Sequence, residues 1–267
     1  MTLDTNDAQS LADAVRVLEN PGLAVQIAEV IGKPIEYSVG RLPDAVVRRI
    51  GDTTNKALRT ALRAAVATMN NERGITPSQR THKMLATLSG AIGGAFGLPA
   101  LAVELPVSTT IILRSVADIA RGQGENIRDV ETQLACIEVF ALGGPAKIEG
   151  GADAGYYATR AALAHAVSNA AQYIAQKGIV EEGAPVIVRL ISKVATRFSG
   201  PVLEKFAAQS IPVIGAAGGA AVNLIFINHF QDMARGHFTV RRLERKYGED
   251  VVRQEYARIQ LADESRQ

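Results

Sequence analysis

The sequence predicts an all-α fold, a single compact domain of about nine to eleven helices in which two Gly/Ala-rich helices are buried. Hydrophobic residues make up 47% of the 267 positions but aromatic residues only 5%, so the apolar content is mainly Ala, Val, Leu and Ile, which suits closely packed helices. Apolar residues recur at steps of three and four, and no segment shows the alternation of a strand flanked by hairpin turns. No low-complexity linker divides the chain.

We predict an N-terminal helical extension at residues 1–40, ahead of an all-helical domain at 41–260. Two short helices are expected in the extension, at Asp7–Leu18 and Leu23–Ile31. A Pro-Gly pair follows the first of them, and Gly32 follows the second.

A longer amphipathic helix is expected from Asp44 to about Met69, directly after Pro43. One of its sides is apolar, and the other carries five basic residues, Arg48, Arg49, Lys56, Arg59 and Arg63. This basic side indicates either contact with an anionic membrane surface or an ordinary solvated helix face.

An apolar hairpin is expected at residues 83–122. Its first arm, Met84–Phe96, is Gly-rich, and its second arm is interrupted by Glu104 and Pro106. Neither arm offers the ~20 uninterrupted apolar residues that span a bilayer. Pro106 also predicts a break in the helix. Buried core helices are therefore favoured over transmembrane ones.

Further helices are expected where Gly and Pro leave uninterrupted segments: Asp129–Leu142, Asp153–Lys177, Val186–Phe198, Val202–Gln209 and the charged Glu249–Ile259. In particular, Ser199-Gly200-Pro201 is expected to separate two helices.

The most distinctive stretch is 211–247, IPVIGAAGGAAVNLIFINHFQDMARGHFTVRRLERKY, which turns from apolar to polar at Asn228. Gly215 and Gly219 lie four residues apart in it, as Gly90 and Gly94 do in the hairpin. Glycines at this spacing fall on one helix face and let another backbone come close. We predict that the two Gly-rich helices form a buried helix–helix contact.

The net charge, the single cysteine and residues 1–10 indicate which classes of protein the chain does not belong to. The net charge is +2 at pH 7, without the obvious basic footprint of a dedicated nucleic-acid binder, so no nucleic acid is expected as a partner. Cys136, the single cysteine, lies in the apolar run QLACIEVFAL and is expected to be a buried thiol. Residues 1–10 lack the pattern of a secretory signal. A cytoplasmic protein is expected, with peripheral association at the inner face of the cell membrane left open.

Candidate ligand-binding residues occupy otherwise apolar helices. Glu104 and Arg114 lie in the second arm of the hairpin, where burial requires an ion-pair partner for each. Asp153, Tyr157 and Arg160 follow steps of four and three along one helix line. Arg160 is suited to bind an anionic head group or a carboxylate, but the same residues also fit an internal network between helices.

A third group lies in the polar half of 211–247. His229 and Asp232 share a helix face there, flanked by His237 and Glu244. The spacing allows buried hydrogen bonds or part of a metal site, but the His-Glu-x-x-His pattern of zinc hydrolases is missing. No catalytic residue, metal or cofactor is therefore predicted. We expect this polar face to form the floor of a pocket, with Asp153 and Arg160 as its neighbours.

A fourth group is basic and follows the third along the chain. It indicates either phosphate binding or an ordinary solvated helix, because acidic residues accompany it. Its members are Arg235, Arg241, Arg242, Arg245 and Lys246.

Three segments together resemble the EcsC family of bacterial proteins. They are Glu104-Leu105-Pro106 leading into IILRSVADIARGQG, then Gly143-Gly144 followed by Asp153, Tyr157 and Arg160, and finally residues 211–248. The resemblance covers about residues 40 to 260. It implies an all-helical cytoplasmic protein and supplies no catalytic residue. The family's namesake is encoded beside the two components of an ABC exporter, which implies membrane transporter components as partners.

The sequence leaves three functions open. The favoured one is a non-enzymatic protein that binds lipid or the membrane surface, as an accessory to an ABC-type transport system. The first alternative is a hydrolase-like enzyme that uses a buried cluster of Asp153, Arg160, His229, Asp232 and His237. The second is an adaptor that presents its charged C-terminal helix to a protein partner.

Overall fold

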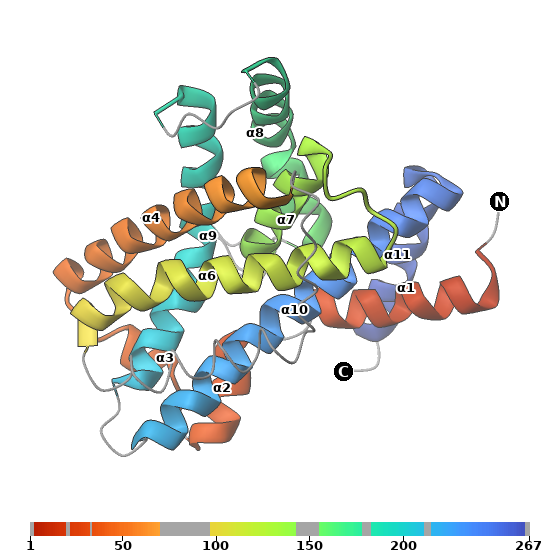
Figure 1. Cartoon of the computed structure of the whole chain (residues 1–267). Coiled ribbons are helices and arrows are strands. Elements are labelled where there is room, and N and C mark those ends of the chain that lie inside the picture. Colours follow the sequence, from red (N-terminus) through yellow and green to blue (C-terminus); the bar gives the residue numbers. More distant parts are fainter. Residues whose placement is uncertain are drawn as a thin grey trace.

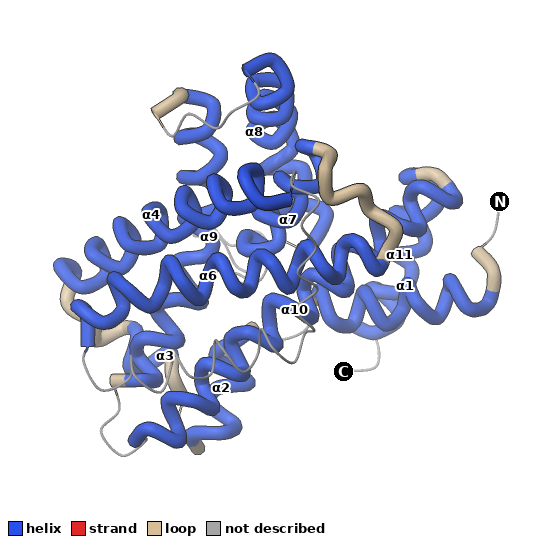
Figure 2. The backbone as a smooth tube through the Cα atoms, viewed as in Figure 1, coloured by secondary structure: helices blue, strands red, loops and turns tan. Residues whose placement is uncertain are grey.

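The computed structural model describes residues 3–19, 22–32, 34–69, 97–142, 155–177, 183–210 and 215–264, and these residues form helices joined by turns (Figure 1; Figure 2). Ten helices and no strand occur in the described part of the chain, so the predicted all-α fold is confirmed. The first of the two Gly-rich helices, Met84–Phe96, lies outside the described residues.

Most helices begin and end close to the predicted positions, but the short helix Glu36–Val39 was not predicted, and two predicted breaks, described below, are absent. In chain order they are α1 (Thr5–Leu18), α2 (Leu23–Ile31), α3 (Glu36–Val39), α4 (Asp44–Met69), α6 (Gly97–Gly122), α7 (Val130–Leu142), α8 (Tyr156–Lys177), α9 (Pro185–Gln209), α10 (Gly215–Tyr247) and α11 (Glu249–Glu264).

Helix α10 is the central element of the fold. It packs against α1, α2, α6, α7, α9 and α11, and in Figure 1 it passes from the region of α2 to that of α1. It places Phe226 and Phe230 in the core, where they meet Phe140 of α7 and Phe198 of α9. Four phenylalanines thus form one cluster where α7, α9 and α10 meet.

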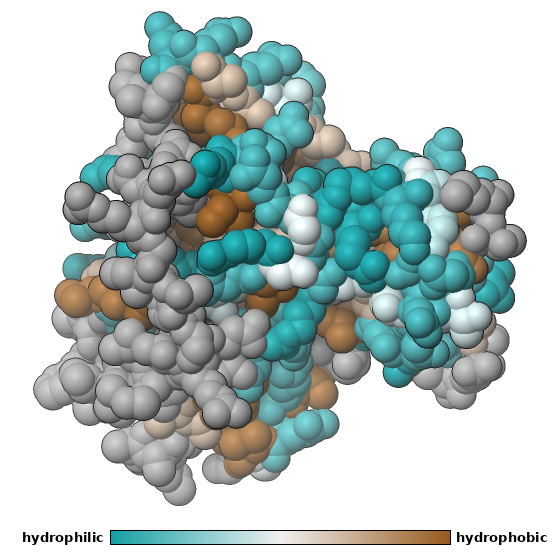
Figure 3. Space-filling view, turned by 45° about the vertical axis from the view of Figure 1, so that its right-hand side comes forward, coloured by the Kyte–Doolittle hydropathy of each residue, from teal (hydrophilic) through white to brown (hydrophobic). Residues whose placement is uncertain are grey.

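Helices α4 and α6 lie side by side and cover α9 and α10 (Figure 1). The apolar side of α4 faces this contact, with Ile50, Leu58 and Leu62 fully buried. Its basic side remains at the surface, where Arg48, Arg49 and Lys56 are exposed. Figure 3 shows one face of the molecule, on which hydrophilic side chains predominate and hydrophobic ones form separate patches.

Two predicted helix breaks are wrong. Helix α6 continues through Pro106, and α9 continues through Ser199-Gly200-Pro201, so that Val186–Phe198 and Val202–Gln209 are one helix. A proline inside a helix removes one backbone hydrogen bond and strains the preceding turn. Packing offsets that cost in α9, because Phe198, Pro201 and Val202 all face the core.

Residues of the predicted N-terminal extension belong to the same core as the rest of the described chain. Leu11 and Val15 of α1 and Ile27 of α2 are buried in it, and α1 packs against α10 and α11. The boundary at residue 40 stays a prediction.

No helix in the described ranges is both long enough and apolar enough to cross a membrane. The second arm of the predicted hairpin, which is α6, instead buries Leu105, Ile112 and Leu113 against its neighbours.

Gly236 sets how closely α1 approaches α10. A Cβ atom at this position would lie 2.7 Å from Leu18 Cγ and 3.0 Å from Leu18 Cδ2, which is closer than side chains pack. Leu18 is itself 9% exposed, so it has little room to move away.

We therefore predict that Gly236→Ala lowers the free energy of unfolding of the natural chain but raises that of a chain that carries Leu18→Ala. In the natural chain the crowding, typically about 1–3 kcal/mol, should exceed the gain in helix propensity of about 1 kcal/mol and destabilise the fold. With Leu18→Ala already present, Gly236→Ala should stabilise it. Urea unfolding of the four chains measures this, and equal effects in both backgrounds would contradict the close contact.

Candidate functional site between α7 and α8

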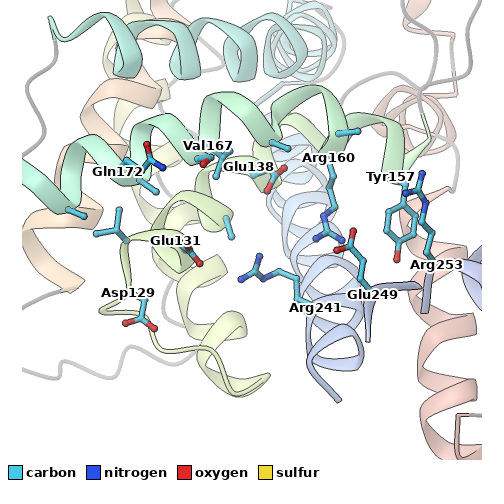
Figure 4. Close-up of a pocket in the computed structure, with 17 residues that line it drawn as sticks. Asp129, Glu131, Glu138, Tyr157, Arg160, Val167, Gln172, Arg241, Glu249 and Arg253 are labelled. Carbon is cyan, nitrogen blue, oxygen red and sulfur yellow. The ribbon is translucent and has the colours of Figure 1, made fainter. Parts of the chain in front are cut away.

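A cleft of about 730 Å³ lies between α7 and α8 and is bordered at one end by α10 and α11 (Figure 4). This volume is within the range of about 300–1,000 Å³ that is usual for a small-molecule pocket. Its apolar lining comprises Val130, Ala135, Ala161, Ala164, Val167, Ala171 and Ala175. At the end near α10 and α11, Figure 4 shows Tyr157, Arg160, Arg241, Glu249 and Arg253.

Glu19, just after α1, fixes the start of α8. Its Oε1 accepts a hydrogen bond from the backbone N–H of Tyr156 at 3.1 Å and another from Tyr256 Oη at 2.7 Å. A carboxylate at a helix N-terminus satisfies an otherwise free N–H group and interacts favourably with the helix dipole. Gly155 lets the carboxylate come this close, since a Cβ there would lie 3.3 Å from Glu19 Oε2.

Arg160 joins α8 to the polar half of α10. Its Nη1 donates to Glu244 Oε1 at 2.7 Å and to Tyr156 Oη at 3.2 Å, and Tyr157 Oη donates to the same Glu244 oxygen at 3.1 Å. The Arg160 side chain is only 20% exposed and the Glu244 side chain 11%. The predicted contact between Arg160 and this part of the chain is therefore present, although its partner is Glu244.

A buried tyrosine–histidine pair lies behind Arg160. Tyr156 Oη is 3.0 Å from His237 Nδ1, and Tyr156 stacks on Tyr256 with ring centroids 5.5 Å apart. Burial, together with Arg160 and Arg241, holds the pKa of His237 well below its usual value. Burial raises the pKa of Tyr156 above its usual value, so both groups are neutral and their role is packing and hydrogen bonding.

The basic side chains of the run in α10 are paired with acidic side chains. Glu125, between α6 and α7, accepts from Arg241 Nε at 2.9 Å and also pairs with Arg245. Arg242 and Lys246 pair with Asp7 of α1 at 2.9 and 2.6 Å. These four basic side chains attach α1 and the start of α7 to α10. Arg235 pairs with Asp232 on its own helix.

Glu138 of α7 is a buried carboxyl group in the charged part of the cleft. It is 7% exposed, and Figure 4 shows it between the α8 and α10 sides of the cleft. Burial raises the pKa of Glu138 to about 7, against the attraction of Arg160 and Arg241.

Glu104 is buried and has the ion-pair partner that its burial requires, whereas Arg114 is not buried. Glu104 Oε1 accepts from Lys205 Nζ of α9 at 2.6 Å, and the two side chains are 5% and 0% exposed. Arg114 is exposed on α6. Ten residues along a helix correspond to a rotation of roughly 80° and a rise of about 15 Å, which keeps these two side chains apart. Neither residue lines the cleft.

The other predicted site residues also lie apart from one another. His229 is buried, Asp232 is half-exposed beside Arg235, and His237 lies about 12 Å along the helix from His229. Asp153 lies outside the described residues. Among the described members of the proposed hydrolase cluster, only Arg160 and His237 come together, on either side of Tyr156, and this geometry gives a hydrolase no support.

No group of three or more His, Cys, Asp or Glu side chains in the described ranges is placed to hold a metal ion. Cys136 is fully buried, as predicted, and burial raises the pKa of its thiol.

Two residues of the cleft did not stand out in the sequence as members of one site. Glu138 lies in the run QLACIEVFAL, and it is the one residue after Gln133 in this run that is not apolar. Burying a carboxyl group among apolar residues costs free energy. An acidic residue inside an apolar run is therefore the signal by which the sequence marks Glu138. In the sequence, Arg241 is distinguished only as one member of the basic run 235–246.

We predict that Glu138 makes the stability of the protein fall as pH rises. Its carboxyl binds a proton more tightly in the folded state than in the unfolded state, so stability is highest below pH 4.5 and decreases up to about pH 7. Relative to Glu138→Gln, the natural chain should lose about 2–3 kcal/mol between pH 5 and pH 8. Urea unfolding at several pH values measures the difference, and the exposed carboxyl change Glu131→Gln is the control. A pH-independent difference would contradict a raised pKa.

Comparison with known proteins identifies the family of this architecture. No curated protein matches the chain. No solved structure matches it either. The family model described as the EcsC protein family matches residues 6–243, which begin in α1 and end in α10 and so include every helix that lines the cleft except α11. The chain belongs to the EcsC protein family.

Proposed function

We propose that the chain is a non-enzymatic protein that binds an amphipathic lipid with an anionic head group in the α7–α8 cleft, at the surface of a membrane. The observation that carries this proposal is that one cleft combines an apolar stripe along α8 with three arginines at one end. An accessory role in a membrane transport system is part of the proposal, because the family's namesake is encoded beside an ABC exporter.

The arginine end suits an anionic head group. Glu244 and Glu125 hold Arg160 and Arg241 in place, but each guanidinium has five N–H donors. The described contacts use Nη1 of Arg160 and Nε and Nη2 of Arg241. The other donors remain for a phosphate or carboxylate, and Arg253, whose guanidinium lies over the Tyr157 ring, adds a third positive charge.

The apolar stripe suits a narrow hydrocarbon chain. It follows α8 from Ala161 to Ala175 at steps of three and four residues, so its members lie on one side of the helix. Small side chains leave a groove, whereas larger ones would fill it. Covering this stripe with an acyl chain would remove apolar surface from water.

The basic side of α4 suits an anionic membrane surface. The apolar side of this helix is already used in the core, so Arg48, Arg49 and Lys56 are what it presents outward. Each basic residue near an anionic bilayer contributes about 1 kcal/mol to binding.

We predict that filling the groove prevents lipid binding. Ala164→Trp places an indole on the stripe, and it should weaken binding of cis-parinaric acid by about tenfold or more, which is about 1.4 kcal/mol. Ala158→Trp is the matched control, because Ala158 is exposed on the same helix outside the cleft. The fluorescence of the fatty acid reports binding. Equal affinity in the two variants would show that the lipid, if bound, lies elsewhere.

We also predict that reversing the charge of α4 reduces membrane association. Arg48→Glu, Arg49→Glu and Lys56→Glu together should abolish flotation with vesicles that contain 30% phosphatidylglycerol, because about 1 kcal/mol is lost at each position. The control carries the same change in net charge at Arg16, Arg121 and Arg258, which are exposed on α1, α6 and α11. If both triple variants float equally well, or the natural chain does not float, the membrane part of the proposal fails.

A further inference from the structure

Glu138 differs from the other carboxyl groups that line the cleft. Asp129, Glu131 and Glu249 are exposed, whereas Glu138 is 7% exposed. Glu125 and Glu244, the buried carboxylates nearby, each accept hydrogen bonds from arginine. Among the described contacts, no hydrogen bond reaches the Glu138 carboxyl. It is therefore a buried polar group directed into the cleft, where a ligand can reach it (Figure 4).

The charges that act on Glu138 come from two elements. Arg160 of α8 and Arg241 of α10 attract its ionised form, and Glu244 of α10 repels it. The remaining charged and titratable groups of the cleft are Tyr157 of α8, Asp129 and Glu131 at the start of α7, and Glu249 and Arg253 of α11. Helices α4, α6 and α9 also pack on α7, but none of their described charged side chains lines the cleft.

The ionised form of Glu138 and an anionic ligand would compete for the same two guanidinium groups. Arg160 and Arg241 already balance Glu244 and Glu125. An ionised Glu138 adds a third carboxylate, and a bound anion would add a fourth negative charge at a largely buried place. Like charges this close raise each other's proton affinity, so one of them takes up a proton.

We propose that Glu138 couples anion binding to proton uptake: the cleft receives an anionic head group between Arg160 and Arg241 when Glu138 is neutral, and binding draws one proton onto its carboxyl. The neutral carboxyl then donates its O–H to an oxygen of the head group. This inference rests on the proposed function, because it places the head group in the same cleft.

The direction of the pH effect follows from the pKa of the empty cleft. Burial raises the pKa of Glu138 to about 7, and a bound anion raises it further. Below pH 7 the carboxyl is already neutral, so affinity is at its highest and hardly changes. Above pH 7 a proton must be taken up, and affinity falls by up to about tenfold for each pH unit.

Calorimetric titration with decanesulfonate tests the coupling, because the charge of this probe does not change with pH. Between pH 6 and pH 9 the natural chain should bind with falling affinity above pH 7. Titration at pH 8 in HEPES and in Tris, whose ionisation enthalpies differ, should reveal uptake of close to one proton. Glu138→Gln should bind equally well at every pH without proton uptake. The control Glu29→Gln, which changes an exposed carboxyl on α2 outside the cleft, should behave like the natural chain.

The outcomes separate this inference from the proposed function. If the natural chain binds decanesulfonate with no proton uptake and no pH dependence, the coupling is wrong and the lipid site stands. If it binds the uncharged decyl maltoside but not decanesulfonate, the cleft has no anion site and the coupling is wrong. If it binds neither, both proposals fail. The two-buffer measurement uses the natural chain, so it decides the question even if Glu138→Gln does not fold.

Discussion

The polar half of α10 holds three distant segments through carboxylates that are almost completely buried. Asp7 of α1, Glu125 before α7 and Glu244, which receives Arg160 of α8, have side chains only 9%, 6% and 11% exposed. Each of these carboxylates accepts hydrogen bonds from at least two side chains, so several contacts share the stabilisation of one buried charge. Hydrogen bonds from Lys246 and Arg242 hold the pKa of Asp7 below its usual value. These pairs attach α8 and the segment before α7, which both border the cleft, to α10.

The cleft forms beside α8, whose first two turns are held by carboxylates. Glu19 fixes the first turn of α8, and Glu244 fixes its second turn through Arg160. Beyond these contacts the small side chains of α8 leave space against α7. The cleft therefore combines a rigid charged end with an apolar part that a ligand can occupy, and rigid placement of polar groups is what gives a binding site its selectivity.

Periodicity and Gly/Pro positions predicted most helix boundaries, because local backbone preferences decide them. The failures at Pro106 and Pro201 arise where packing overrides those preferences: Leu105 and Val202 lie in the core, so the helix persists across the proline. The candidate site was less predictable. Tyr157 and Arg160 could be found from helical spacing, but the pairing of Glu104 with Lys205 joins residues 101 positions apart, which spacing along one helix cannot reveal.

The contact between α1 and α10 has a consequence for how the chain folds. Asp7 and Arg242 are separated by 235 residues, so α1 is synthesised long before the surface of α10 that it packs against. Until then Leu11 and Leu18 have no apolar surface of α10 to cover them. Contacts between such remote positions slow folding, and apolar surface exposed in the meantime favours aggregation. We therefore expect the docking of α1 to be a late step of folding that waits for α10.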